Sequence, residues 1–286
     1  MNSKNAADNT LYSSNDGAAT GPLNGFWSED DLNIFLHEFM TPMTLSFFSL
    51  DMLKKALKDH KDKNVHNYLN ILNFNFHRVN KLTKRFSDVV SIETPGNEPE
   101  MCIIDLVEFL ENLCQNIPRA AEGAKAKIKF ETSCKFANIK ADINYLESIF
   151  LNLISNAFKH TKDSARDIIV QIFQESDSYA VEVKDFGIGI KRENLENIFD
   201  KFFRCSSDLS VSGLGLGLYI VKSFSDKMSA RVEVKSAYQK SSSFFVYFPK
   251  IEGDSSQTVY QPLSGYGDKV ASSISNSIVT EFSDIF

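Results

Sequence analysis

Residues 142–160 read DINYLESIFLNLISNAFKH, and residues 183–190, further along the chain, read VKDFGIGI. In the first stretch Asn152, Asn156 and Lys159 fall at i, i+4 and i+7, which is one face of a helix. The opposite face is apolar and suited to packing on a sheet: Ile149, Leu153 and Ala157. We therefore predict a helix over 142–160 that covers a sheet and carries a polar stripe.

Two amides and one ammonium group side by side suit a metal-bound polyphosphate. The amide oxygen of Asn156 is a hard ligand of the kind that Mg²⁺ prefers, and Lys159 can meet a phosphate as a point charge. Taken alone, the same spacing is typical of a solvated helix face. A nucleotide site is predicted only because further motifs follow in order.

Two glycine clusters follow this helix. Asp185-Phe186-Gly187-Ile188-Gly189 comes after an expected strand, and its carboxylate can accept a hydrogen bond from an adenine amino group. Gly213, Gly215 and Gly217 precede a helix expected to begin near Leu216, where backbone N–H groups can reach phosphate oxygens. Each cluster alone is more typical of a turn, but the ordered set is specific.

These segments resemble the N, G1, F and G2 boxes of the histidine kinase ATP-binding domain, whose superfamily includes Hsp90, DNA gyrase and MutL. The resemblance implies a two-layer ATP-binding α/β sandwich of the Bergerat type, with ATP and Mg²⁺ as cofactors. It assigns Mg²⁺ to Asn156, phosphate to Lys159 and the adenine amino group to Asp185. The residues that match are Asn152, Asn156, Lys159, His160, Asp185, Gly187, Gly189, Phe199, Phe203, Gly213, Gly215 and Gly217.

The resemblance also identifies residues 204–212 as an ATP lid, with Arg204 as a phosphate contact. Asn152 stands where the ATPases and chaperones of the superfamily usually carry a glutamate that activates water. That replacement favours phosphoryl transfer over hydrolysis. His160 stands where the family often has tyrosine, which is a mild departure.

Before this domain, apolar or small residues recur at steps of four and three in two successive stretches, which predicts a helical hairpin. The first seam is Leu32, Leu36, Phe39, Met43, Ser46, Leu50, Leu53 and Leu57, and the second is Val65, Tyr68, Leu72, Phe76, Val79, Leu82, Phe86 and Val89. We predict that two hairpins complete a four-helix bundle as a homodimer. The alternative is that the seam packs on the chain's own second domain.

The motif HEFMTP at 37–42 resembles the H box of the dimerisation and histidine-phosphotransfer domain. The resemblance makes His37 the phosphoryl acceptor, and Thr41 a residue that orients water for dephosphorylation of a partner. Because Leu36 lies in the seam, His37 is expected on the flank of the bundle. Glu38 can orient the imidazole and accept its proton. Leu36 and Met40 depart from the family, which has a small and a basic residue there.

Composition sets outer limits on these predictions. A net charge of −6 argues against a nucleic-acid partner, and the four cysteines lie too far apart for a zinc site. No apolar run approaches the roughly 20 residues of a bilayer span, so we expect a cytoplasmic protein or a piece of a receptor. The expected organisation is a disordered leader (1–27), the hairpin (28–94), a linker (95–100), an α+β catalytic domain (101–250) and a flexible tail (251–286).

The predicted function is a histidine kinase that autophosphorylates His37 from Mg-ATP and passes the phosphoryl group to an aspartate in the receiver domain of a response regulator. The same chain would also dephosphorylate that regulator. Two alternatives stay open, an ATP-binding signalling scaffold and a degenerate kinase that acts mainly as a phosphatase. Asn152 disfavours a pure ATPase.

Overall fold

The computed structural model describes residues 29–59, 64–120, 127–161, 167–204 and 213–251, together with 277–282 apart from residue 279. The leader expected over 1–27 lies outside these ranges, as does the lid beyond Arg204. None of the helices in the described ranges combines the length and the apolar character that a bilayer-spanning segment needs.

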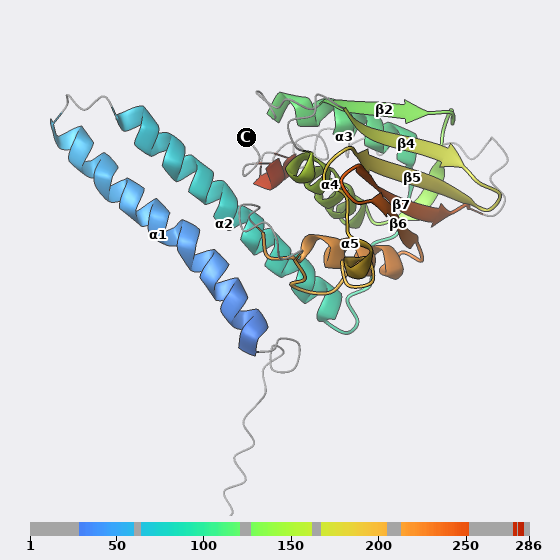
Figure 1. Ribbon diagram of the computed structural model, residues 1–286, viewed down its shortest axis with the longest axis horizontal. Helices are drawn as coiled ribbons and strands as arrows, with labels where there is room; N and C mark the ends of the chain where they lie inside the picture. The colour runs from blue at the N-terminus through green and yellow to red at the C-terminus, as the bar shows by residue number, and fades with distance from the viewer. Residues whose placement is uncertain are drawn as a thin grey trace, which may run out of the picture.

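The chain begins with the predicted hairpin. Helix α1 (Glu29–Asp59) packs along helix α2 (Val65–Glu93), and the pair projects from the rest of the molecule (Figure 1). The leucine at 72 is buried, but many other large apolar side chains of the hairpin remain exposed. An apolar seam of this kind needs a partner surface. Its exposed side chains are therefore candidates for contact with a second molecule.

The second domain is built on a mixed sheet of five strands, in the order β2 (Ile128–Thr132), β4 (Ile168–Gln174), β5 (Ser178–Asp185), β7 (Ser241–Pro249) and β6 (Arg231–Ala237). The pair β2–β4 is parallel, and the other neighbours are antiparallel. A short antiparallel ladder joins β1 (Cys102–Asp105) to β3 (Asn138–Ala141). The strand expected before the first glycine cluster is β5, and Asp185 is its last residue.

Helices cover one face of this sheet. They are α3 (Leu106–Ala120), α4 (Ile143–His160) and α5 (Gly217–Lys227), with a short 3-10 turn, η1, at Arg192–Asn194. Their apolar side chains form one core with the inward residues of the strands, among them Val170, Val183 and Val246. The other face carries a small separate cluster of Phe173, Ala180, Phe245 and Tyr247. The predicted two-layer sandwich is confirmed.

The two domains share a core along α2. Leu82 and Val89, which belong to the second predicted seam, are buried in the same apolar cluster as α4 and α5. Ser91 lies with its hydroxyl 3.4 Å from that of Tyr145 on α4. The C-terminal half of the seam therefore packs on the chain's own second domain, as in the alternative to the homodimer.

The end of the chain differs from the flexible tail expected over 251–286. The residues described at 277–282 are helical, and Ile278 and Phe282 are each 1% exposed within the main core. The ring of Phe282 packs edge-on against Phe158 of α4, with centroids 5.5 Å apart. Alternation of apolar and polar residues in this stretch gave no indication of where it would pack.

Candidate functional site

A cavity of about 190 Å³ opens where the ends of α4 and β5 meet the start of α5. It contains most of the residues that the sequence assigned to nucleotide binding, namely Asn156, Lys159, His160, Asp185, Gly189, Arg204, Gly213, Gly215 and Gly217. Segments that lie far apart in the sequence thus line one cavity. Asn152 and Gly187 belong to the same region without lining it.

Helix α4 begins and ends where its sequence dictates. The Asp142 side chain caps the first turn by accepting from the backbone N–H groups of Asn144 (2.8 Å) and Tyr145 (3.3 Å). Lys159 and His160 lie in the last turn, where cations favour the negative end of the helix dipole. This placement brings both residues, with Asn156, to the cavity.

Asp185 ends strand β5 and is almost fully buried. Burial raises the pKa of its carboxyl, while hydrogen bonds from Gly187 and Ser242 act in the opposite direction. The Gly187 N–H donates to Oδ1 at 2.8 Å. A side chain at Gly187 would not fit, because its Cβ would lie 2.0 Å from the His160 carbonyl oxygen. The glycine therefore holds the end of β5 against the end of α4.

Around Asp185 the cavity wall is apolar. Phe203, which belongs to the F box predicted from the sequence, forms part of this wall. The other apolar lining residues carry no assignment from the sequence, and most of them come from the loops on either side of η1 and from β7: Ile188, Ile190, Ile198, Leu218 and Phe244. A slot that combines apolar walls with one buried carboxylate suits a flat heterocycle that carries an amino group. Large apolar residues at loop ends were the only sequence signal for them.

The second glycine loop packs on the predicted F box. Gly215 has φ +70, in the left-handed region, and a Cβ there would lie 2.7 Å from the Phe203 carbonyl oxygen. Both constraints require glycine. The backbone then enters α5 at Gly217, as expected for a helix beginning near Leu216.

The described lining of the cavity is cationic, although the whole chain carries a net charge of −6. Arg85, Lys159 and Arg204 contribute three positive charges, and Asp185 is the one carboxylate among the lining residues that the structure describes. Positive side chains that line a cavity raise the local concentration of anionic ligands. This arrangement favours a polyphosphate ligand.

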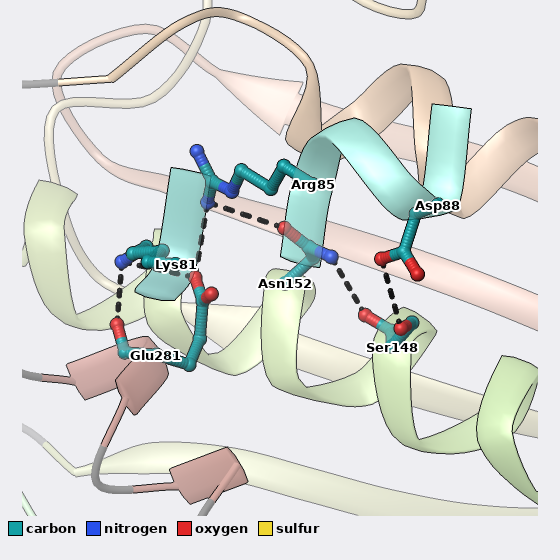
Figure 2. Close-up of polar contacts among 6 residues, drawn as sticks. All are labelled: Lys81, Arg85, Asp88, Ser148, Asn152 and Glu281. Atoms are coloured by element: carbon teal, nitrogen blue, oxygen red, sulfur yellow. Dashed lines mark hydrogen bonds and ion pairs between the residues drawn. The ribbon is translucent and has the colours of Figure 1, made fainter. Parts of the chain in front are cut away.

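Asn152 differs from the expectation of a polar, solvated helix face. It is 4% exposed, and its Nδ2 donates to the Ser148 carbonyl oxygen at 2.8 Å. Its Oδ1 accepts from Arg85 Nη2 at 3.3 Å, and a Cβ on Gly217 would lie 2.8 Å from the same oxygen (Figure 2). The polar face of α4 is therefore covered by α2, because Arg85 reaches across from the hairpin.

Two more polar contacts tie α2 to α4. The Ser148 hydroxyl donates to Asp88 Oδ2 at 3.1 Å (Figure 2), and Lys84 Nζ lies 3.9 Å from Glu147 Oε1. Further down α2, Glu93 accepts from the Tyr219 hydroxyl at 3.0 Å and pairs with Lys201. Burial, with Glu93 beside it, raises the pKa of Tyr219 to about 12.

The candidate acceptor site lies on α1. His37 is part of this helix, and expectations about its side chain fall outside what the structure describes. Glu38 is partly buried and lies 3.7 Å from Arg78 Nη2 of α2, while Thr41 is exposed. Residues 205–212 of the expected lid also lie outside the described ranges.

Known proteins share this fold and this domain. Residues 141–252 match the family described as histidine kinase-, DNA gyrase B- and HSP90-like ATPase. The sensor protein RprX of Bacteroides fragilis is 24% identical over 229 residues, which is 79% of this chain and 44% of RprX. The sensor histidine kinase GraS of Staphylococcus haemolyticus is 23% identical over 231 residues, covering 78% of this chain and 61% of GraS.

Solved structures agree on the fold. The histidine kinase AdeS of Acinetobacter baumannii superposes with a TM-score of 0.58 at 17% identity, covering 75% of this chain and 98% of that one. Full-length ShkA in complex with AMPPNP gives 0.55 at 20% identity, covering 73% and 46%. The resemblance to sensor histidine kinases is confirmed, and this chain spans less than two thirds of the RprX and GraS sequences.

Proposed function

We propose that this relative of the sensor histidine kinases binds Mg-ATP in the cavity described above and transfers the γ-phosphoryl group to His37. The observation that carries the proposal is the convergence of a buried carboxylate, an apolar slot and three cations on one hollow of the ATPase domain. Adenine would lie against Asp185, and the triphosphate would extend toward Lys159, Arg204 and the loop at Gly213–Gly217.

The residues present fit such a ligand. A carboxylate has about four acceptor positions, and the Gly187 N–H uses one of those at Asp185, so the carboxylate can also accept a hydrogen bond from an adenine amino group. Glycine at 215 and 217 keeps the phosphate end free of side chains. ShkA, which shares the fold, was solved with the ATP analogue AMPPNP.

Mg²⁺ would enter with the nucleotide. Among the described residues no cluster of three or more acidic, histidine or cysteine side chains could hold a metal ion by itself. Mg²⁺ keeps several waters and is usually bound through one or two protein oxygens and the phosphates. The Asn156 amide oxygen lines the cavity and would supply such a ligand. The bound ion would neutralise charge on the β- and γ-phosphate oxygens.

The reaction would be a phosphoryl transfer from oxygen to nitrogen. The bond between the γ-phosphorus and the bridging oxygen breaks, ADP leaves with that oxygen, and a P–N bond forms to one ring nitrogen of His37. The proton on the other ring nitrogen passes to the neighbouring Glu38 carboxylate. An aspartate of a receiver domain would then accept the phosphoryl group, and Thr41, exposed on α1, would orient water when that aspartyl phosphate is hydrolysed.

A homodimer would complete the hairpin. Nine of the twelve large apolar side chains that are exposed in the described part of the chain lie on α1 and α2. They are Met40, Leu45, Phe48, Leu50, Leu57, Leu69, Ile71, Phe74 and Phe76, between 39% and 62% exposed. Exposed apolar side chains in this number favour a partner surface, and a second hairpin would bury part of them as a four-helix bundle.

Incubation with γ-labelled ATP tests the function. We expect the wild type to become labelled, and the label to be labile in acid and stable in alkali, as phosphohistidine is. The His37→Gln variant should lose the label, whereas His66→Gln, at a second histidine of the hairpin, should keep it. Persistent label on His37→Gln, or no label on a wild type that binds ATP, would contradict the proposal.

A further inference from the structure

The C-terminal segment 277–282 lies in the groove between α2 and α4 (Figures 1 and 2). Ile278 and Phe282 are spaced i, i+4, so that both point from one side of a helical turn into the core. Phe282 meets Phe158 of α4 edge-on, and that aromatic contact anchors the segment to the nucleotide-binding domain.

Glu281 anchors the same segment to the hairpin. Its Oε1 lies 3.1 Å from Lys81 Nζ and 3.0 Å from Arg85 Nη2, and its backbone oxygen accepts from Lys81 Nζ at 2.5 Å (Figure 2). All three side chains are buried. Removing one partner of a buried ion pair is costly because the other charge stays desolvated. The segment therefore joins α2 to α4 by a charged contact on one side and an aromatic contact on the other.

The charged contact continues into the nucleotide site. Arg85 Nη2, which binds Glu281, also donates to Asn152 Oδ1, and the Arg85 side chain lines the cavity. Its Nη1 lies 4.0 Å from the position of a Cβ built on Gly213. Glu281 thus holds a guanidinium at the border of the phosphate end, together with the amide of Asn152.

This arrangement opposes transfer within the chain. α2 stands between α1 and the second domain (Figure 1), and the cavity lining takes Arg85 from α2 and none of its described residues from α1. For the γ-phosphorus to reach His37 of the same chain, the second domain has to leave α2 and turn about the linker near Gly96. Each contact that joins α2 to α4 restrains that motion.

We propose that residues 277–282 are an autoinhibitory latch, which holds the nucleotide-binding domain on α2 through Glu281 and slows autophosphorylation until the segment leaves the groove. The inference rests on the proposed transfer to His37. The segment is additional to the ATPase domain, whose family match ends at residue 252.

The test compares the full chain with a version ending at residue 276 and with Glu281→Gln, which keeps the shape of the side chain and removes its charge. We expect both to autophosphorylate at least about fivefold faster than the wild type, the lower end of usual coupling between sites. Glu193→Gln is the matched control, since its ion pair with Lys191 is exposed, and its rate should not change. A peptide of residues 277–286 added to the shortened chain should slow it again, and the same peptide carrying the Glu281→Gln substitution should not.

Two further readouts keep the latch and the kinase reaction separable. Hydrogen exchange at amides 81–89 and 148–158 should quicken in Glu281→Gln, and binding of the fluorescent analogue TNP-ATP should persist. Unchanged exchange, or a wild type that becomes labelled as fast as Glu281→Gln or faster, overturns the latch. Loss of TNP-ATP binding in both variants would make the segment a structural part of the site, and so also overturns it. Faster exchange without phosphate on any version supports the latch and contradicts the kinase reaction.

Discussion

Asp88 lies where α2 meets α4, and burial there raises the pKa of its carboxyl to about 6, even though Lys84 and Arg85 act in the opposite direction. A carboxyl whose pKa is higher in the folded protein stabilises it below the unfolded value near 4, and this contribution is lost as the pH rises through 6. Asp88→Asn should therefore gain stability over the wild type as the pH rises from 4 to 7. The gain would be on the order of 2–3 kcal/mol. Urea unfolding of both proteins across that range measures it, and a difference that does not vary with pH would contradict the assignment.

Asp185 is the residue on which the orientation of the nucleotide depends. Asp185→Asn replaces the charged acceptor with an amide and should weaken ATP binding by about 1.5–3 kcal/mol, or roughly 10- to 150-fold. Asp177→Asn, in the exposed turn between β4 and β5, is the control and should bind as the wild type does. Displacement of TNP-ATP by ATP gives both affinities. Equal affinity in the two variants would mean that the cavity holds adenine elsewhere or not at all.

Gly215 determines the backbone conformation of the loop that leads into α5. Alanine there would need φ +70 and would place its Cβ 2.7 Å from the backbone of Phe202 and Phe203, so the loop has to move. Gly96 in the linker has φ +79 but no atom within 4 Å of such a Cβ, which makes Gly96→Ala a control for backbone strain alone. Both variants should lose about 1 kcal/mol of stability from strain. Only Gly215→Ala should also lose affinity for TNP-ATP, and retention of wild-type affinity would show that the loop does not shape the site.

Most helices and strands could be predicted from the sequence, because residues close to them in the chain determine where they begin and end. Asp142 caps α4, glycines follow the C-terminal end of β5 and stand at the start of α5, and burial alternates along β4. The contact by which Arg85 of α2 covers Asn152 could not be predicted from the sequence. Its partner Arg85 comes from a helix 67 residues earlier, and Lys81, Arg85 and Asp88 fall beside the apolar seam like an ordinary solvated stripe. Contacts between distant elements leave no local pattern of that kind.

The assembly of the whole molecule depends on the exposed half of the hairpin. Phe48 is 62% exposed on α1, and Phe48→Glu would place a charge on the apolar surface that the proposed second hairpin covers. We expect the wild type to sediment as a dimer and Phe48→Glu as a monomer at the same concentration. Ile103→Glu, at an exposed apolar residue of the second domain, should remain dimeric. A monomeric wild type would contradict the dimer.

The packing of the domains against each other is the other property of the whole molecule that local patterns missed. The sequence predicts a hairpin, a linker and a catalytic domain as separate units. Yet Leu82 and Val89 of the hairpin, and Ile278 and Phe282 of the tail, belong to one apolar core with the sandwich. Burial of this kind depends on which surfaces meet in three dimensions. Apolar periodicity predicts only that an apolar face will be covered, and does not say by which part of the molecule.

The position of the phosphoryl group after reaction with ATP tests the central claim most directly. Wild-type protein is incubated with Mg-ATP, digested at mildly alkaline pH and fragmented under conditions that preserve P–N bonds, and the modified residue is read from the mass spectrum. The account predicts phosphate on His37 in the peptide that contains residues 37–42. Phosphate on another residue, or an unmodified His37 in protein saturated with nucleotide, would contradict it.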